Sequence, residues 1–184
     1  ERVKMLQEGI RFAAMIHVKD VATHVGYMPE NPYDPNYAGV LVCLKELVKQ
    51  CKENGQNFLF ETGQETPVTL KRAIQDIEKE LGKGNVGINL DPANLVMYGK
   101  ANPVDALEVF GEYVMGIHGK DGKYPTDGHM LGDEVPLGQG KVNYPAFVAK
   151  LKEIGYAGDI TIEREISGEE QKKDIVMAKA EIGR

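Results

Sequence analysis

Hydrophobic and polar positions along the chain form two alternating patterns. Short apolar runs, typical of strands, are followed by longer stretches in which apolar residues recur every three or four positions, as in amphipathic helices. The clearest run is 58–60 (FLF), which is too short for a helix and typical of a strand buried on both faces. Glu61 closes this run, and Thr66 and Pro67 then provide a helix N-cap and a first helical residue.

The same alternation repeats over the whole chain. We expect strands over 20–26, 58–61, 86–91, 113–118 and 159–164. We expect helices over 1–16, 40–53, 67–81, 103–111, 145–154 and 168–182. A helix followed by five βα units predicts an α/β fold, with a parallel sheet and helices packed against it.

Two segments show neither pattern. Residues 27–37 contain three prolines and are predicted to be irregular and exposed. The glycine-rich stretch 119–140 has no clear periodicity, and at 22 residues it is long for a connection within a compact domain. Loops of that length are usually lids or binding loops, so we expect a functional segment there.

Pattern alone leaves both an open doubly wound sheet and a closed (β/α)8 barrel as candidates. The barrel is favoured by strand positions that are mixed and often small or polar, as in barrel interiors: Leu59, Asn89, Gly116 and Thr161. A full barrel needs eight units and typically about 250 residues. We therefore expect residues 1–184 to form one TIM-barrel domain that lacks the first three βα units.

Composition narrows the function classes. The chain has 42% hydrophobic residues and a net charge of −6, which argues against a protein that chiefly holds nucleic acid or anionic membrane. No apolar run approaches the roughly 20 residues of a membrane helix. Cys43 and Cys51 lie eight residues apart on one predicted helix, too far for a disulfide, and are expected to be buried free thiols. With no leader at the N-terminus, these features predict a cytoplasmic protein.

A set of polar side chains closes four successive predicted strands: Glu61, Asp91, His118 and Glu163. Their spacings of 30, 27 and 45 residues match one βα unit each, the last enlarged by the long loop. Strand ends of one parallel sheet meet at the same edge, where ligands bind in β/α folds. Three carboxylates and an imidazole suit Mn²⁺, Mg²⁺, Co²⁺ or Zn²⁺, so the sequence predicts one divalent-metal site.

Three of these residues have a simpler alternative. Asp91 precedes a proline and is equally placed to cap a helix. His118 could be a hydrogen-bonded core histidine, and Glu163 could form a surface ion pair with Arg164. Glu61 follows three buried apolar residues, and a structural explanation is weakest for it.

The motifs also carry a family resemblance. In order and spacing, the chain resembles the sugar phosphate isomerase/epimerase family with the xylose isomerase-like barrel through ATHVG, FLFETGQET, GINLDPANL, GIHGKDG, VPLGQGKVNYPAF and ITIEREI. The resemblance implies the fourth to eighth βα units of that barrel. From the related ketose 3-epimerases it implies one metal held by Glu61, Asp91, His118 and Glu163, with Mn²⁺ the first expectation. Glu61 and Glu163 would also serve as catalytic base and acid.

The resemblance suggests weaker substrate-binding candidates. Glu65 matches a contact to a substrate hydroxyl, and Lys120 and Asp121 match polar substrate contacts, although a capping carboxylate and a solvated loop are the alternatives. His24 is expected to line the pocket or to be a buried structural histidine. Asn94 stands where ketose epimerases carry a substrate-contacting histidine, and the arginine that follows their metal histidine is absent from residues 119–124, so the sugar remains open.

These features together predict a metal-dependent sugar or sugar-phosphate isomerase or epimerase. It would act by proton transfer through a metal-stabilised enediolate on a small-molecule sugar. The resemblance implies a homodimer or homotetramer. A DNA-repair endonuclease of the same superfamily is an alternative. It would need a histidine-rich zinc site and a basic face, whereas this chain has four histidines and is acidic. A catalytically inert barrel fragment is the third hypothesis.

Overall fold

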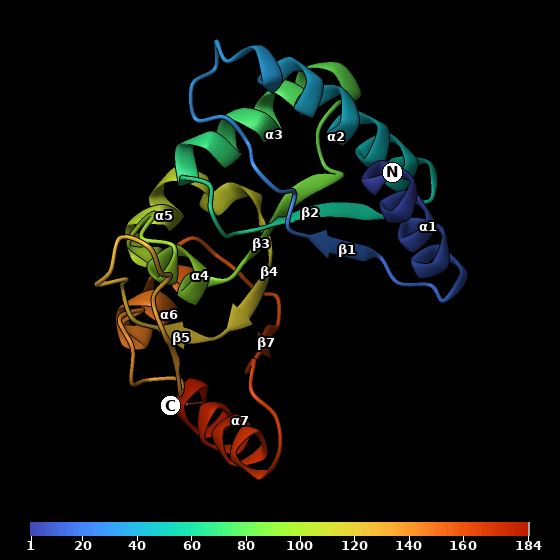
Figure 1. Ribbon diagram of the computed structural model, residues 1–184. Coiled ribbons are helices and arrows are strands. Elements are labelled where there is room, and N and C mark those ends of the chain that lie inside the picture. The colour runs from blue at the N-terminus through green and yellow to red at the C-terminus, as the bar shows by residue number, and fades with distance from the viewer. Residues whose placement is uncertain (184) are drawn as a thin grey trace.

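The computed structural model describes residues 1–183 and contains a parallel sheet of five strands in the order β1-β2-β3-β4-β7. The strands are β1 (Asp20–Thr23), β2 (Asn57–Glu61), β3 (Val86–Leu90), β4 (Val114–Gly119) and β7 (Ile160–Ile162). The sheet curls into an open C-shaped half-barrel, and helices cover its convex side (Figure 1). This confirms the predicted α/β architecture of a partial barrel.

The helices are α1 (Arg2–Met15), α2 (Pro35–Glu53), α3 (Pro67–Leu81), α4 (Pro92–Met97), α5 (Pro103–Phe110), α6 (Tyr144–Glu153) and α7 (Glu169–Ile182), with a 3-10 turn over Gly111–Tyr113. Helices α2 to α5 each begin with a proline, whose fixed φ suits the first helical position and whose missing N–H costs nothing there. No helix in residues 1–183 combines the length and apolar character needed to cross a bilayer.

One helix boundary was wrong and one short helix was missed, and both involve an N-cap residue followed by proline. Helix α2 begins at Pro35, not near Val40, because the Asp34 side chain accepts the Asn36 N–H and caps the helix within the loop predicted to be irregular. Helix α4 was not predicted at all. It has only six residues, and Asp91 and Pro92 start it with the same cap-plus-proline signal.

The predicted long loop also contains regular structure. β5 (Asp121–Gly122) and β6 (Glu134–Val135) pair as a short antiparallel ladder, so the expectation of an irregular segment throughout 119–140 was wrong in part. Two residues per strand are too few to produce a recognisable alternation. The ladder leaves 123–133 as the projecting part of the loop.

The core lies between the sheet and its outer helices. Phe58 and Phe60 point outward from β2 and pack edge to face, with ring centroids 5.6 Å apart, among buried side chains of α2, α3 and α5. Cys51 belongs to this core, as predicted. Cys43 is exposed, so its predicted burial was wrong.

Neighbouring strands of the sheet are staggered relative to one another. Glu61 pairs with Asn89, Asn89 with Gly116, and His118 with Thr161. Asp91 therefore lies two residues beyond the level of Glu61. This stagger is typical of a tilted barrel and brings the strand-end side chains together at the carboxyl edge.

Candidate metal centre

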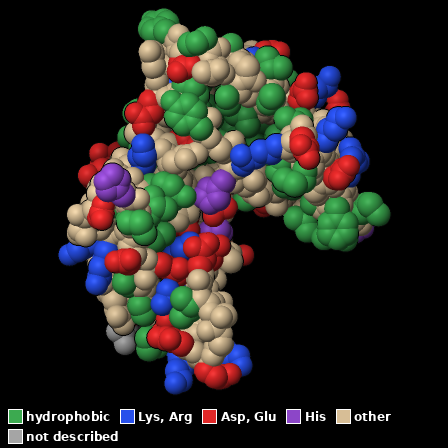
Figure 2. Space-filling view, viewed as in Figure 1, with side chains coloured by type: hydrophobic (Ala, Val, Ile, Leu, Met, Phe, Trp, Pro, Cys, Tyr) green, Lys and Arg blue, Asp and Glu red, His purple; other side chains and the backbone are tan. Residues whose placement is uncertain are grey.

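Four side chains from four strand ends converge on one point. Each of Glu61, Asp91, His118 and Glu163 offers an oxygen or nitrogen atom within 4.8 Å of those of the other three. His118 Nδ1 lies 3.6 Å from Glu61 Oε1 and 3.4 Å from both Asp91 Oδ2 and Glu163 Oε2. Figure 2 shows acidic side chains and histidines gathered on the concave side of the molecule.

Two of the converging atoms lack a hydrogen-bond partner among the described residues. Asp91 Oδ2 and His118 Nδ1 are both fully buried, yet neither is hydrogen-bonded. Buried polar atoms in native proteins are nearly always satisfied, and these two face each other beside two further carboxylates. A divalent cation between them would satisfy both atoms and offset the clustered negative charge, so the donor set fits a metal ion.

Asp91 divides its two carboxylate oxygens between two tasks. Oδ1 accepts the Asn94 N–H at 2.9 Å and caps α4, so the helix-capping alternative is correct for this oxygen. Oδ2 is left free to face the centre. The cap fixes the carboxylate rotamer, and the position of the second oxygen follows from it.

The His118 ring is held by a neighbouring amide. Its Nε2 lies 2.9 Å from the side-chain amide of Asn89, which orients Nδ1 toward the carboxylates. A Cβ on Gly116 would come within 2.5 Å of the Asn89 side-chain oxygen, so a larger residue at this interior position would displace the Asn89 side chain. Sequence reasoning missed the role of Asn89, although it is the one polar residue in an otherwise apolar, wholly buried strand.

The local charges shift two pKa values. Burial raises the pKa of Glu61, with Glu163 and Asp91 adding to the effect and the two facing histidines, His24 and His118, opposing it. The pKa of His118 is raised chiefly by Asp91, against the opposing effect of burial. A carboxylate whose pKa is raised exchanges protons more readily near neutral pH than an ordinary one.

Lys120 adds a positive charge beside the candidate metal ligands. Its ammonium lies 2.9 Å from Glu163 Oε2, 3.0 Å from Glu165 Oε2 and 3.6 Å from Asp91 Oδ2. Burial alone would lower the pKa of Lys120, but these three carboxylates raise it above its usual range. Glu163 is therefore paired with Lys120. The alternative partner Arg164 instead contacts Glu134 and Asp174.

Asp121 organises the long loop. Its Oδ2 accepts the backbone N–H groups of Gly138 and Gly140, and its Oδ1 those of Gly122 and Val142. Both oxygens are thus occupied by backbone donors. This accounts for the buried carboxylate structurally, and the predicted substrate contact of Asp121 gains no support from the geometry.

The other predicted substrate contacts lie around the centre. His24 Nε2 lies 3.5 Å from Glu61 Oε1, and its side chain is 49% exposed, so it lines the open side of the site. Glu65 is buried, and burial raises its pKa. The buried Asn94 amide donates to the Thr62 carbonyl at 3.0 Å. For all three, a contact with substrate stays a prediction.

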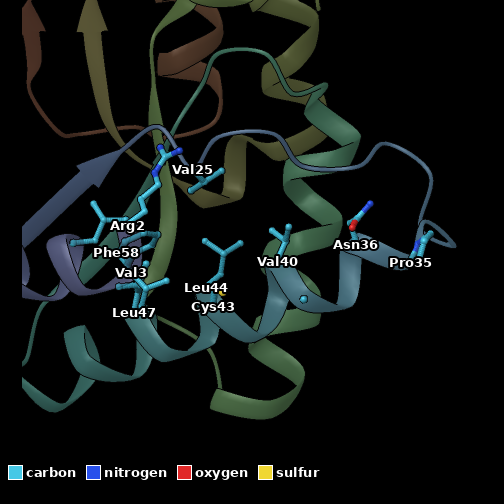
Figure 3. Close-up of a pocket in the computed structure, with 12 residues that line it drawn as sticks. Arg2, Val3, Val25, Pro35, Asn36, Val40, Cys43, Leu44, Leu47 and Phe58 are labelled. Carbon is cyan, nitrogen blue, oxygen red and sulfur yellow. The ribbon is translucent and has the colours of Figure 1, made fainter.

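A separate cavity of about 490 Å³ lies between α1, α2 and the sheet. Figure 3 shows that α2 forms one wall, with Val40, Leu44 and Leu47 on it and Val3 and Phe58 nearby. The lining is mainly aliphatic, and none of the four candidate ligands contributes to it. The cavity is therefore separate from the candidate metal centre.

Comparison with known proteins gives a consistent result. A family model described as xylose isomerase-like TIM barrel matches residues 1–181. The crystal structure of a xylose isomerase domain protein from Planctomyces limnophilus is 36% identical, with a TM-score of 0.88 over 99% of this chain and 63% of that one. An uncharacterized protein of Methanocaldococcus jannaschii is 29% identical over 98% of this chain and 62% of its own length. The chain thus spans a little over three fifths of these relatives.

More distant structures share the fold. A D-tagatose 3-epimerase-like protein is 24% identical, with a TM-score of 0.69 over 98% of this chain and 69% of that one. A xylose isomerase-like TIM barrel protein from Mycobacterium smegmatis, in complex with magnesium, is 18% identical, with a TM-score of 0.68 over 98% of this chain and 67% of that one. At these identities the similarity is one of fold.

Proposed function

The chain belongs to the xylose isomerase-like TIM barrel family, and from that premise we propose that it is a divalent-metal-dependent sugar or sugar-phosphate isomerase or epimerase. The observation that carries the proposal is the convergence of Glu61, Asp91, His118 and Glu163, two of whose buried polar atoms have no hydrogen-bond partner among the described residues. The similar proteins are consistent with this chemistry, since they include a xylose isomerase domain protein and a D-tagatose 3-epimerase-like protein.

The four side chains divide into ligands and proton-transfer groups. A bound divalent ion would supply Lewis-acid stabilisation of negative charge on the substrate oxygens. Asp91 and His118, which are held by the α4 cap and by Asn89, would act as ligands only. Glu61 and Glu163 approach the centre from non-adjacent strands, so they could serve two faces of one substrate carbon as base and acid.

The surroundings of the centre suit a polyhydroxylated ligand. The imidazole of His24 borders the exposed side of Glu61. His24 and Glu65 both lie against Gly63, where a Cβ would come within 3.0 Å of the imidazole and 4.0 Å of the carboxylate. We propose that these two side chains bind sugar hydroxyls, and that Mn²⁺ is the ion, with Mg²⁺, Co²⁺ and Zn²⁺ as competitors.

The first test is calorimetric titration of the metal-stripped protein with Mn²⁺. We expect one site per chain. Glu61→Gln should weaken it by at least about 2 kcal/mol, the scale for losing a charged hydrogen-bonding partner. Glu8→Gln, which removes an exposed carboxylate on α1, is the matched control and should bind as the wild type does. Absent saturable binding, or binding indifferent to Glu61, would contradict the proposal.

The second test concerns the reaction. Metal-loaded protein is incubated in D₂O with a panel of ketoses and their phosphates, and proton NMR follows the loss of signals next to the carbonyl. We expect deuterium incorporation into at least one sugar, which Glu61→Gln and Glu163→Gln abolish. Tight metal binding without exchange into any sugar would instead favour a catalytically inert protein.

A further inference from the structure

The environment of Lys120 is unusual for a lysine. The residue directly follows the carboxyl end of β4, and its side chain is only 1% exposed. Lysine is almost never fully buried unless its charge is paired. Within residues 1–183 the ammonium forms ion pairs with the carboxylates of Asp91, Glu163 and Glu165. A contact to a diffusing sugar would require an accessible ammonium, and this one is enclosed.

The ammonium contacts the same oxygens that face the candidate metal centre. Glu163 Oε2 lies 2.9 Å from the ammonium and 3.4 Å from His118 Nδ1. Asp91 Oδ2 lies 3.6 Å from the ammonium and 3.4 Å from the same ring nitrogen. The lysine therefore acts directly on the two oxygens whose positions define half of the ligand set.

The backbone of Lys120 is fixed as firmly as its side chain. The buried Tyr144 hydroxyl, at the start of α6, accepts the Lys120 N–H at 2.8 Å and donates to the Lys120 carbonyl at 2.9 Å. The next residue, Asp121, is tied to the loop by four backbone donors. The backbone position from which the Lys120 side chain extends toward the carboxylates is therefore fixed.

We propose that Lys120 is a positioning residue of the metal centre, holding Glu163 and Asp91 in the arrangement that receives the ion. The inference rests on the proposed metal-binding function. Glu61, Asp91 and Glu163 place three negative charges within a few ångströms, and these repel one another when no ion is bound. One fixed ammonium beside Asp91 and Glu163 reduces this repulsion before the ion binds. The hydrogen bond to Glu163 also restricts its rotamer.

The test is Mn²⁺ affinity of Lys120→Met, an uncharged side chain of similar length. We expect affinity to fall about 10- to 100-fold, the usual effect of removing a group that orients a ligand. The electron paramagnetic resonance spectrum of bound Mn²⁺ should also change, because the ligand geometry is altered. Lys123→Met, three residues along the same loop and exposed, is the control and should retain wild-type affinity. Circular dichroism and thermal unfolding establish that each variant is folded.

A second variant tests the same role without removing the charge. Tyr144→Phe deletes the hydroxyl that holds the Lys120 backbone, and we expect a smaller loss of affinity, about 3- to 10-fold. It also serves as the test if Lys120→Met does not fold.

Several outcomes overturn the inference. Unchanged or tighter Mn²⁺ binding by Lys120→Met would show that the ammonium does not position the ligands, or that it competes with the ion. Unchanged metal affinity with a raised KM for sugar would make Lys120 a substrate contact. If the wild type itself binds no ion, the proposed function fails together with this inference. If the wild type binds Mn²⁺ and Glu61→Gln does not, the proposed metal site stands. Unchanged Mn²⁺ affinity of Lys120→Met would then overturn only the role of Lys120.

Discussion

The hydroxyl of Thr62 forms two hydrogen bonds to the backbone of Asp91. It accepts the Asp91 N–H and donates to the Asp91 carbonyl, both at 2.8 Å, and the threonine is fully buried. Since Thr62 directly follows Glu61, the contact joins the ends of β2 and β3 and fixes the separation of two candidate metal ligands. The same arrangement recurs where the Tyr144 hydroxyl holds the backbone of Lys120.

Thr62→Val should weaken both the fold and the metal site. It preserves side-chain shape but leaves the buried Asp91 N–H and carbonyl without a partner, which costs about 1–3 kcal/mol of unfolding free energy. Urea denaturation measures this loss, and calorimetry with Mn²⁺ should show weaker binding. Thr62→Ser retains the hydroxyl and should recover most of both quantities. Equal stability of the valine and serine variants would contradict a structural role for the two bonds.

The strand ends could be predicted from sequence because each is marked locally. An apolar run followed by a single polar residue located Glu61 and Asp91, and βα alternation placed them at one edge of a parallel sheet. Helix α3 was predicted with its observed bounds because Pro67 and Gly82 punctuate it. The contacts that support the site could not be predicted in this way. They join residues far apart in the chain, such as Lys120 with Glu163, and depend on register and rotamer, neither of which leaves a local signal.

Two functional features left signals in the sequence that were interpreted only in part. Asn89 interrupts an apolar strand, which was used as evidence for a barrel interior and also indicates a buried polar role. The Asp91-Pro92 step was used to close a strand and to suggest a helix cap, but the short helix α4 that it starts was not predicted. In contrast, nothing local distinguishes Asp121, which collects loop N–H groups, from the substrate contact that the resemblance implied.

Gly116→Ala should disturb the metal site through Asn89. The added Cβ would lie 2.5 Å from the Asn89 side-chain oxygen, so the amide that orients His118 must shift. We expect a loss of about 1–3 kcal/mol in stability from overpacking, together with weaker Mn²⁺ binding. Gly39→Ala, in α2 and with nothing within 4 Å of the new Cβ, should instead stabilise the protein slightly. Unaltered metal binding in Gly116→Ala would show that Asn89 does not orient the imidazole.

Arg164 should determine how firmly α7 is attached. The buried residues of this helix are Asp174 and Ala178. The Arg164 guanidinium lies 2.8 Å from the Asp174 carboxylate of α7 and 2.9 Å from the Glu134 carboxylate of β6, so it links the two elements. Arg164→Met removes the cationic partner of two largely buried carboxylates, of which Glu134 still accepts the Glu165 backbone N–H, and we expect a loss of about 1–3 kcal/mol. Hydrogen exchange should show α7 losing protection before the sheet does. The exposed Lys172→Met, within the same helix, is the control, and uniform loss of protection across the chain would contradict local attachment.

Glu65 should make stability depend on pH. The residue is 3% exposed, and burial raises its pKa above the unfolded value of about 4.3, against smaller opposing effects of its own backbone N–H, His24, Lys100 and Gln64. Because the folded state then binds the proton more tightly than the unfolded state, stability falls as pH rises from the unfolded pKa through the folded pKa. Glu65→Gln lacks this titration. Its unfolding free energy relative to the wild type should therefore increase across that window and level off above it, as measured by urea denaturation at a series of pH values. A difference that does not change with pH would show that folding leaves the pKa of Glu65 unchanged. A fall in sugar turnover in the same variant, at unchanged Mn²⁺ affinity, would separately support the proposed contact with a substrate hydroxyl.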